Sequence, residues 1–256
     1  MTNETILEAQ NLRKSFGGLV AVDDVSIQIA KGSMHAIIGP NGAGKTTLFN
    51  LLSGMMAPDS GKIFYKGENI TNIAPQRRAH MGIGRSFQIT NIFPNLTVLE
   101  NVRLGTQAMG GDNFRIFKLA DQYPVYVEKA MEVIALVGLQ GREGVLARNL
   151  AHGEKRKLEL GIMLSTDPEL LLFDEPTAGM SSEQVPELIE IINKVVRLKN
   201  STAILVEHRM DMVMSVSNRI TVMAQGRLLA EGTPHEIARN AQVQAAYLGD
   251  LYGELA

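Results

Sequence analysis

Short runs rich in apolar and β-branched residues mark the first part of the chain. They occupy positions 6–12, 25–30, 34–39 and 62–67, and glycine-containing turns such as FGG and KG separate them. Runs of this length that are bounded by turn residues are typical of β-strands. Little helical periodicity lies between them, so the pattern predicts a strand-rich section at the start of the chain.

From about residue 46 the pattern changes to strands that alternate with helices. Three apolar runs, at 169–175, 202–208 and 219–224, have the length and composition of buried strands. Between the first two lies 182–199, where apolar residues recur at helical spacing and Lys and Arg cluster near the end. This alternation is typical of βαβ units, whose parallel strands form one sheet that binds ligands at the strands' carboxyl ends.

One segment lacks a regular period. Residues 105–125 contain the sequence MGGDN, which indicates a flexible loop between helices. No repeat or low-complexity linker divides the sequence, so we expect a single domain over residues 1–256. Its expected parts are a core at 1–88 and 166–230, a helical subdomain at about 89–165, and a C-terminal helical tail at about 232–256.

Composition narrows the class of protein. The 256 residues are 45% apolar, enough for a large core, and the net charge of -2 argues against a general nucleic-acid binder. The chain has no cysteine, which excludes disulfides and thiol catalysis and fits a cytoplasmic protein. We recognise no signal-peptide pattern and no run near the roughly 20 apolar residues that span a bilayer. If the protein works at a membrane, we expect another subunit to hold it there.

The stretch GPNGAGKT, from Gly39 to Thr46, fits the phosphate-binding pattern G-x-x-x-x-G-K-[ST] and lies between a strand and a helix. Gly42 and Gly44 let the backbone curl so that its N–H groups face phosphate oxygens, and the following helix N-terminus adds to the attraction. Lys45 can reach the β- and γ-phosphates, and the Thr46 hydroxyl can bind Mg²⁺. A chance Gly-rich turn fits this context poorly. The predicted nucleotide contacts are Gly39, Pro40, Asn41, Gly42, Ala43, Gly44, Lys45, Thr46 and Thr47.

Two acids follow an apolar strand far downstream. Asp174 ends the run LLLF, where the carboxylate of a P-loop site meets Mg²⁺, and Glu175 comes next. In such a site Glu175 would contact the attacking water as a base or polarising group. The alternative is a solvated strand end, which the upstream phosphate loop disfavours. The sequence therefore predicts a nucleoside-triphosphate hydrolase.

Three further landmarks complete an ordered series. Gln88 lies in RSFQ after a short strand, the stretch LAHGE precedes a helical run, and His208 ends the strand that follows the one carrying Asp174. The whole order resembles the ATP-binding subunits of ABC transporters, over about residues 5–250. The resemblance implies the α/β fold of a P-loop NTPase (ABC ATPase), with a β-rich antiparallel edge subdomain and a helical insertion.

The resemblance also implies a role for each landmark. Phe16, in KSFGG, matches the aromatic residue that stacks on adenine, and residues 89–104 match the region that receives the membrane subunits. Gln88 matches the glutamine that contacts Mg²⁺ and water, and His208 the histidine that contacts the γ-phosphate. Taken alone, none of these side chains would indicate more than ordinary packing. The implied catalytic residues are Lys45, Gln88, Glu175 and His208, and the implied Mg²⁺ ligands are Thr46, Gln88 and Asp174.

LAHGE departs from the family's usual signature, LSGGQ, because Ala151, His152 and Glu154 replace Ser, Gly and Gln. In the family this helix start binds the γ-phosphate held by the P-loop of a second copy or homologue. The implied contacts are Ala151, His152, Gly153 and Glu154. Backbone N–H groups around Gly153 can still serve. The missing hydroxyl is worth about 1–2 kcal/mol, so we expect weakened rather than abolished closure of the dimer.

Other consequences follow from the same departures. Ala151 has no hydroxyl, so the sequence predicts no capping box at this helix. Glu154 adds negative charge near an anionic ligand, which is unfavourable unless it faces away or pairs with Lys155 or Arg156. Ser181, after DEPTAGM, stands where the family often has Asp. Because the P-loop and Glu175 keep the usual form, we expect the site on this chain's P-loop to hydrolyse ATP.

Among subfamilies, the motifs resemble most closely the ATPases of branched-chain amino-acid uptake systems. The grounds are GIGRSFQ before FPNLTVLENV, the insertion at 105–125, HGEKRKLELG, DEPTAGM, VEHRMDMVM and the final AYLG. Urea-uptake and lipopolysaccharide-export ATPases share several of these, although the insertion argues against the second. A soluble ABC ATPase of DNA repair or translation, a P-loop kinase or GTPase, and a non-hydrolysing paralogue each lack support in the motifs.

The resemblance implies a motor subunit with specific partners. ATP binding would close a head-to-tail dimer with a second ATPase subunit, identical or different, and hydrolysis would reopen it. The movement would pass to membrane permease subunits and indirectly serve a substrate-binding protein, with no role for nucleic acid. The implied location is the cytoplasmic face of the cell membrane, as a peripheral subunit.

Overall fold

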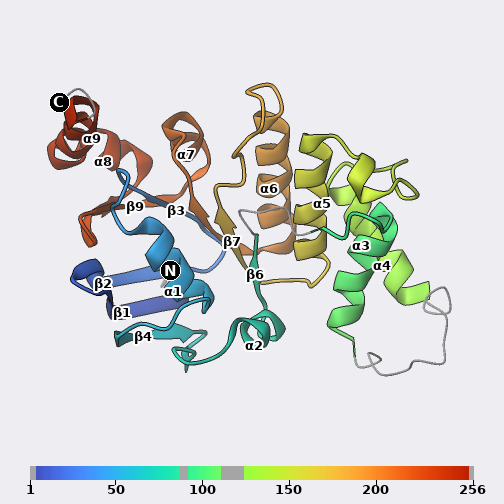
Figure 1. Cartoon of the computed structure of the whole chain (residues 1–256), viewed down its shortest axis with the longest axis horizontal. Helices are drawn as coiled ribbons and strands as arrows, with labels where there is room; N and C mark the ends of the chain where they lie inside the picture. Colours follow the sequence, from blue (N-terminus) through green and yellow to red (C-terminus); the bar gives the residue numbers. More distant parts are fainter. Residues whose placement is uncertain (1–3, 87–91, 111–123, 254–256) are drawn as a thin grey trace.

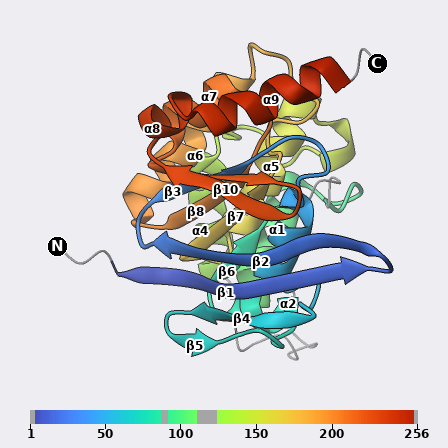
Figure 2. The ribbon, with the colours of Figure 1, turned by 90° about the vertical axis from the view of Figure 1, so that its left-hand side faces the viewer.

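The computed structural model of the chain describes residues 4–86, 92–110 and 124–253. An antiparallel sheet forms one edge of the molecule. Its strands lie in the order β2-β1-β4-β5 (Figure 2). Val25, Ile27 and Ile29 of β2 are buried and the residues between them are exposed, as expected for a sheet with one face on the core. The strands are β1 (Thr5–Phe16), β2 (Leu19–Ala30), β4 (Ser60–Tyr65) and β5 (Glu68–Asn69).

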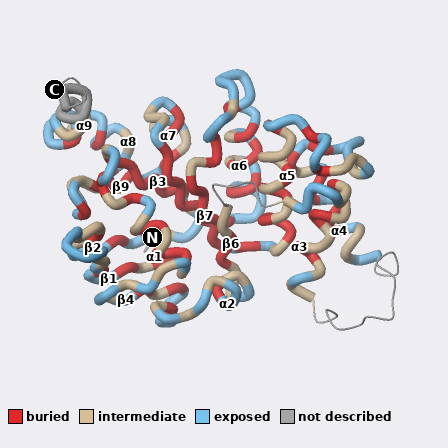
Figure 3. The backbone as a smooth tube through the Cα atoms, in the orientation of Figure 1, coloured by how far each residue is buried: buried red, intermediate tan, exposed pale blue. Residues whose placement is uncertain are grey.

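A second, mostly parallel sheet forms the centre, in the order β10-β9-β3-β8-β7-β6. Three of its strands, β3, β7 and β8, are buried along their whole length (Figure 3). Strands covered on both faces consist of continuous apolar runs, which is why the sequence predicted them. The strands are β3 (Met34–Ile38), β6 (Ile83–Arg85), β7 (Leu170–Asp174), β8 (Thr202–Val206), β9 (Arg219–Ala224) and β10 (Arg227–Gly232).

Helices cover the central sheet and extend beyond one end of it (Figure 1). The predicted helix at 182–199 corresponds to α6, which begins three residues later. Within the described ranges, none of the helices combines the length and apolarity needed to cross a bilayer. The helices are α1 (Lys45–Ser53), α2 (Pro75–His80), α3 (Val98–Ala108), α4 (Pro124–Leu136), the short 3₁₀ helix η2 (Ala147–Asn149), α5 (His152–Leu164), α6 (Val185–Lys199), α7 (Met210–Val216), α8 (Pro234–Ala238) and α9 (Ala241–Gly253).

The helices α3, α4 and α5 pack against one another at the end of the molecule farthest from the antiparallel sheet (Figure 1). A capping box starts α3, because the Thr97 hydroxyl accepts from the Glu100 N–H and the Glu100 carboxylate accepts from the Thr97 N–H. Part of the aperiodic stretch 105–125 is helical, since α3 continues to Ala108 and α4 begins at Pro124. Residues 111–123 lie outside the described part. The predicted combination of an α/β core, an antiparallel edge and a helical insertion is confirmed.

Candidate active site

The loop between β3 and α1 holds the predicted phosphate site. Two of its glycines, Gly39 and Gly44, have positive φ angles of 152° and 96°. A Cβ at Gly39 would lie 2.2 Å from the carbonyl oxygen of Met223, and a Cβ at Gly44 would lie 2.2 Å from that of Ala21. Only glycine therefore allows the loop to pass this close to strands β9 and β2.

Lys45 begins α1, and its side chain turns back over this loop. Its Nζ donates hydrogen bonds to the carbonyl oxygens of Gly39 (2.7 Å) and Pro40 (2.9 Å). The residue is only 5% exposed, so its ammonium group lies within the curve of the loop, close to the N-terminus of α1. The other predicted contacts are Ala43, which is buried, Pro40, Gly44 and Thr47, which are partly exposed, and Asn41, Gly42 and Thr46, which are exposed.

Asp174 ends β7 and is 2% exposed. Its Oδ2 lies 3.5 Å from Nη2 of Arg85, and its Oδ1 has no hydrogen-bond partner among the described residues. Burial raises the pKa of Asp174, and the neighbouring charge of Arg85 opposes that rise. An unpartnered oxygen on a buried carboxylate fits a cation. Thus the donor set suits Mg²⁺, which is bound by one or two carboxylates together with substrate phosphates.

The described residues contain no group of three or more His, Asp and Glu side chains that could hold a metal by themselves. A metal at Asp174 would therefore depend on oxygens from a bound nucleotide, as Mg²⁺ commonly does.

Glu175 and His208 come together although 33 residues separate them. Their strands β7 and β8 pair in parallel, with Asp174 opposite Val206, so both side chains leave the same edge of the sheet. Glu175 has a φ of 49°, its N–H donates to the carbonyl of Val206 (2.9 Å), and its Oε1 lies 2.9 Å from Nε2 of His208. Left-handed backbone at a residue other than glycine is uncommon and concentrates at functional sites.

The sequence that forms the phosphate loop and carries the buried acid matches the model of a known protein family. The family model described as "ABC transporter" matches residues 22–178. This chain belongs to that family. A second model, described as "Branched-chain amino acid ATP-binding cassette transporter", matches residues 227–251. The ABC transporter resemblance drawn from the motifs is confirmed, and with it the ATPase activity.

Full-length relatives agree with this assignment. The chain is 37% identical to the high-affinity branched-chain amino acid transport ATP-binding protein LivG of Salmonella typhimurium, covering 97% of this chain and 99% of LivG. It is 36% identical to the corresponding protein BraF of Pseudomonas aeruginosa, covering 96% and 98%. A crystal structure of the ADP conformation of an ABC transporter cassette superposes with a TM-score of 0.84, at 32% identity and over 96% of this chain and 99% of the other.

Two predicted contacts of this ABC ATPase lie apart from the phosphate loop in sequence. Phe16 ends β1 and is 47% exposed, so its ring is accessible for the predicted stacking on adenine. The ammonium of Lys14 lies 5.9 Å from the centre of that ring. Gln88 falls in 87–91, outside the described residues, and its role stays a prediction.

The signature stretch of the ABC ATPase forms the start of α5. Ala151 is the N-cap residue and has no side-chain bond, but its N–H donates to Oε2 of Glu154 (3.0 Å), which is one half of a capping box. The other carboxylate oxygen of Glu154 lies 2.9 Å from Nε of Arg142. Of the two arrangements considered for Glu154, pairing with Lys155 or Arg156 is not found among the described residues: its carboxylate bends back toward the N-cap and pairs with Arg142 in the preceding loop.

The other signature residues lie against the loop that follows β7. Gly153 is buried, and a Cβ there would lie 3.1 Å from Nε2 of Gln184. His152 is exposed, and its Nε2 lies 3.1 Å from the position of a Cβ on Gly179. Ser181, in the same loop, is exposed, and its carbonyl oxygen accepts from the Gln184 N–H (3.0 Å). The signature and the loop after Glu175 therefore form one continuous surface.

Replacing Ala151 with Ser should raise both stability and ATPase rate. The new hydroxyl can accept from the Glu154 N–H and complete the capping box, which would raise the free energy of unfolding by about 1 kcal/mol. It would also supply the hydrogen-bond donor missing from the signature. Urea unfolding of the chain and the ATPase rate of the assembled transporter measure the two effects. Ala135→Ser, on the exposed face of α4, is the control for stability. An unchanged or lower ATPase rate for Ala151→Ser would contradict the idea that the absence of this hydroxyl lowers the ATPase rate of the wild type.

Two residues to which the sequence analysis gave no role lie in the site. Glu207 precedes His208 and is 4% exposed, although its side chain is a carboxylate. Arg85 ends β6 and faces Asp174. The sequence signals for these two residues were weak. Glu207 is an acid that directly follows an apolar strand, and Arg85 is an arginine inside GIGRSFQ. Only the tertiary contacts place Arg85 beside Asp174 and Glu207 against Thr177 and the His208 backbone.

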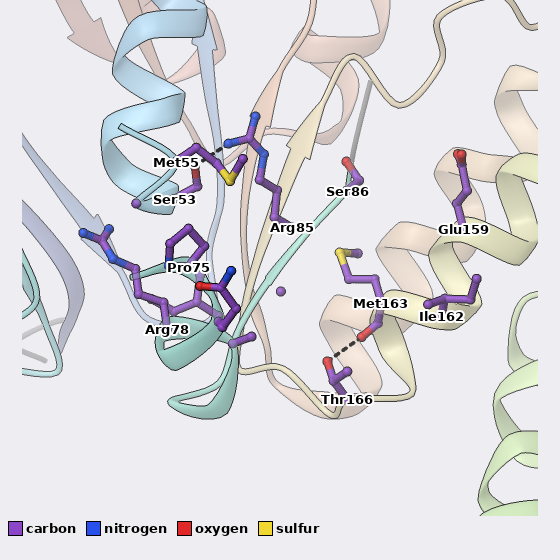
Figure 4. A pocket seen from close by; sticks show the side chains of 15 residues that line it. Ser53, Met55, Pro75, Arg78, Arg85, Ser86, Glu159, Ile162, Met163 and Thr166 are labelled. Atoms are coloured by element: carbon purple, nitrogen blue, oxygen red, sulfur yellow. Dashed lines mark hydrogen bonds between the residues drawn. The ribbon is translucent and has the colours of Figure 1, made fainter. Parts of the chain in front are cut away.

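Arg85 also connects Asp174 to a pocket of about 550 Å³ (Figure 4). Its guanidinium lies 4.8 Å from the centre of the Phe49 ring, donates to Oδ1 of Asn50 (2.8 Å) and bonds the hydroxyl of Ser53. One side chain therefore touches the pocket, α1 and the buried carboxylate.

The pocket lies between the α1–α2 side of the core and α5 (Figure 4). Met55 and Pro75 line one side, and Ile162 and Met163 of α5 line the other, so the walls are mostly apolar. Arg78 also lines it and donates to the carbonyl oxygens of Leu52 and Ile70 (both 2.7 Å), which holds α2 against the end of α1.

Proposed function

We propose that this chain is the ATP-hydrolysing subunit of a transporter that imports branched-chain or related amino acids. One observation carries the cargo class, which is that the chain aligns over nearly its whole length with LivG and BraF. The separate match of residues 227–251 to the branched-chain amino acid model supports it. The convergence of the phosphate loop, Asp174 and the Glu175–His208 pair supports hydrolysis by this chain itself.

The geometry supports a separate role for each group in the site. The loop amides and Lys45 bind the β- and γ-phosphates of ATP. Glu175 orients the attacking water and accepts its proton, and His208 is held beside it at 2.9 Å, where it can also contact the γ-phosphate. Thr46 and Asp174, with Gln88 by resemblance, would hold Mg²⁺, which neutralises charge on the phosphates.

A second ATPase subunit completes the proposed site. The start of α5 lies on the far side of α6 from α1 (Figure 1), so the stretch around Gly153 is separated from the phosphate loop of its own chain. Backbone N–H groups at a helix start bind anions well. We therefore place this signature on the γ-phosphate held by a head-to-tail partner, either a second copy or a homologous ATPase.

We propose that membrane permease subunits receive the movement produced when the ATPase dimer closes and reopens. The apolar pocket between the core and α5 can accept a permease segment, and Arg85 would connect that contact to Asp174. The chain would then lie at the cytoplasmic face of the membrane as a peripheral subunit. A substrate-binding protein would act through the permeases, and nucleic acid would have no part.

Uptake measurements on cells that lack this chain test the proposal. Uptake of labelled leucine, isoleucine or valine should be lost and should return with the wild-type chain but not with Glu175→Gln. The chain should also co-purify from membranes with two permease subunits and a binding protein for these amino acids. Loss of urea uptake alone would indicate a urea or amide importer. Co-purification with lipopolysaccharide-export machinery would overturn the import assignment.

A further inference from the structure

Glu207 is a buried carboxylate in a position where burial is costly. It follows the apolar strand β8 directly and is 4% exposed. Among the described residues, no Lys, Arg or His forms an ion pair with it. Removing a carboxylate from water without a counter-charge is unfavourable unless hydrogen bonds replace the lost hydration. The hydrogen bonds that Glu207 accepts therefore explain how its carboxylate can be buried.

Those partners all belong to the two loops that carry the Glu–His pair. Oε1 accepts from the hydroxyl (2.6 Å) and the N–H (3.2 Å) of Thr177, two residues after Glu175. Oε2 accepts from the N–H of His208 (3.1 Å). The distance to the Thr177 hydroxyl is typical of a charge-assisted bond. One carboxylate thus joins the loop after β7 to the loop after β8.

The side chains of the pair have few other hydrogen bonds to fix their geometry, although strand pairing and the bond from the Glu175 N–H to the Val206 carbonyl hold the backbone. The side chains of Glu175 and His208 are 28% and 46% exposed, and Glu175 adopts a left-handed backbone conformation. In the described part of the chain, the side-chain hydrogen bonds between these two loops are that contact and those of Glu207. Displacing a reacting group by about 1 Å can cost about a hundredfold in rate. The spacing of the two loops is therefore important for hydrolysis.

We propose that Glu207 is a positioning residue for ATP hydrolysis, which holds the Glu175 and His208 loops at a fixed separation through Thr177 and the His208 backbone. It does not touch the substrate, and its effect is exerted through the pair. The proposal rests on the roles of Glu175 and His208 proposed above, and it does not depend on which solute is transported.

Two nearly isosteric variants test this role in the assembled transporter. Glu207→Gln keeps one acceptor oxygen and loses the other, and Thr177→Val removes only the hydroxyl donor. Each should lower kcat about tenfold or more while the KM and Kd for ATP change less than about threefold, because the phosphate loop is elsewhere. Glu231→Gln, which removes an acid paired with Arg219 at the far edge of the sheet, should leave kcat unchanged.

A double-mutant cycle separates positioning from a general structural effect. If Glu207 acts through the pair, Glu207→Gln should lower kcat by less than about twofold further in a His208→Gln background. Additive losses, or parallel losses of kcat, ATP affinity and melting temperature, would overturn the proposal. So would a kcat within twofold of wild type in both single variants. If Glu207→Gln does not fold, Thr177→Val decides by the same criteria. Wild-type activity of Glu175→Gln would instead overturn the proposed function.

Discussion

Replacing Glu175 with Gln should lower the steady-state ATPase rate about a thousandfold while ATP still binds. The amide fills the same space and keeps an oxygen near His208, but it cannot accept a proton from the attacking water. The phosphate loop and Lys45 are unchanged, so the Kd for ATP should stay within a few-fold of wild type. Phosphate release by the assembled transporter and equilibrium binding of labelled ATP measure the two quantities.

Glu169→Gln is a matched control for this variant. Glu169 immediately precedes β7 at its other end, is exposed, and pairs with Lys66, so its loss should leave the rate unchanged. Because the Glu175→Gln chain would retain ATP, an ATP-dependent dimer should accumulate, which size-exclusion chromatography with light scattering detects. Hydrolysis at the wild-type rate would show that Glu175 is not the base. A rate loss matched by an equal loss of ATP affinity would assign it to binding instead.

Replacing Asp174 with Asn should remove most of the Mg²⁺ dependence of nucleotide binding and lower the ATPase rate at least about a hundredfold. Asn keeps a neutral oxygen in place of the unpartnered Oδ1 but loses the charge that attracts the cation. The fold should survive, because Arg85 keeps its bonds to Asn50 and Ser53.

The affinity for ATP is measured in the presence of Mg²⁺ and of EDTA, for the wild type and for Asp174→Asn. A thermal melt of each protein checks the fold. In the wild type the two affinities should differ, and in Asp174→Asn they should nearly coincide. Asp167→Asn is the control, because Asp167 precedes β7 at its opposite end and pairs with Lys199. An Asp174→Asn chain with the full wild-type response to Mg²⁺ would exclude this carboxylate as a ligand.

Local patterns predicted much of the fold correctly. The runs at 34–39, 169–175 and 202–208 are strands β3, β7 and β8, because strands buried on both faces must be continuously apolar. The phosphate loop was also predicted from the sequence, because its conformation requires glycines at fixed spacing, a strand before it and a helix after it. The strand β10 was not predicted. The stretch that forms it, RLLAEG, is partly exposed at an edge of the sheet, so its apolar pattern is weak.

At the signature helix, local sequence patterns indicate only part of the contacts. The sequence correctly indicated that Ala151 supplies no side-chain cap, but it gave no partner for Glu154 outside its own helix. Arg142 lies 12 residues earlier, in a loop that approaches the helix start only after the chain has turned through η2. Ion pairs between loops depend on that path, and no spacing rule contains it.

The sequence by itself determined the family, the phosphate loop and the order of the acidic and histidine motifs, because each is a short stretch whose residue types are set by local backbone or chemical needs. The tertiary structure decided which of these groups meet. Parallel pairing of β7 with β8 brings Glu175 to His208 and buries Glu207 between their loops, and parallel pairing of β6 with β7 brings Arg85 to Asp174. Those contacts depend on strand order and register. Strands buried on both faces are continuously apolar and lack the alternation that specifies register locally, so packing of the whole sheet decides it.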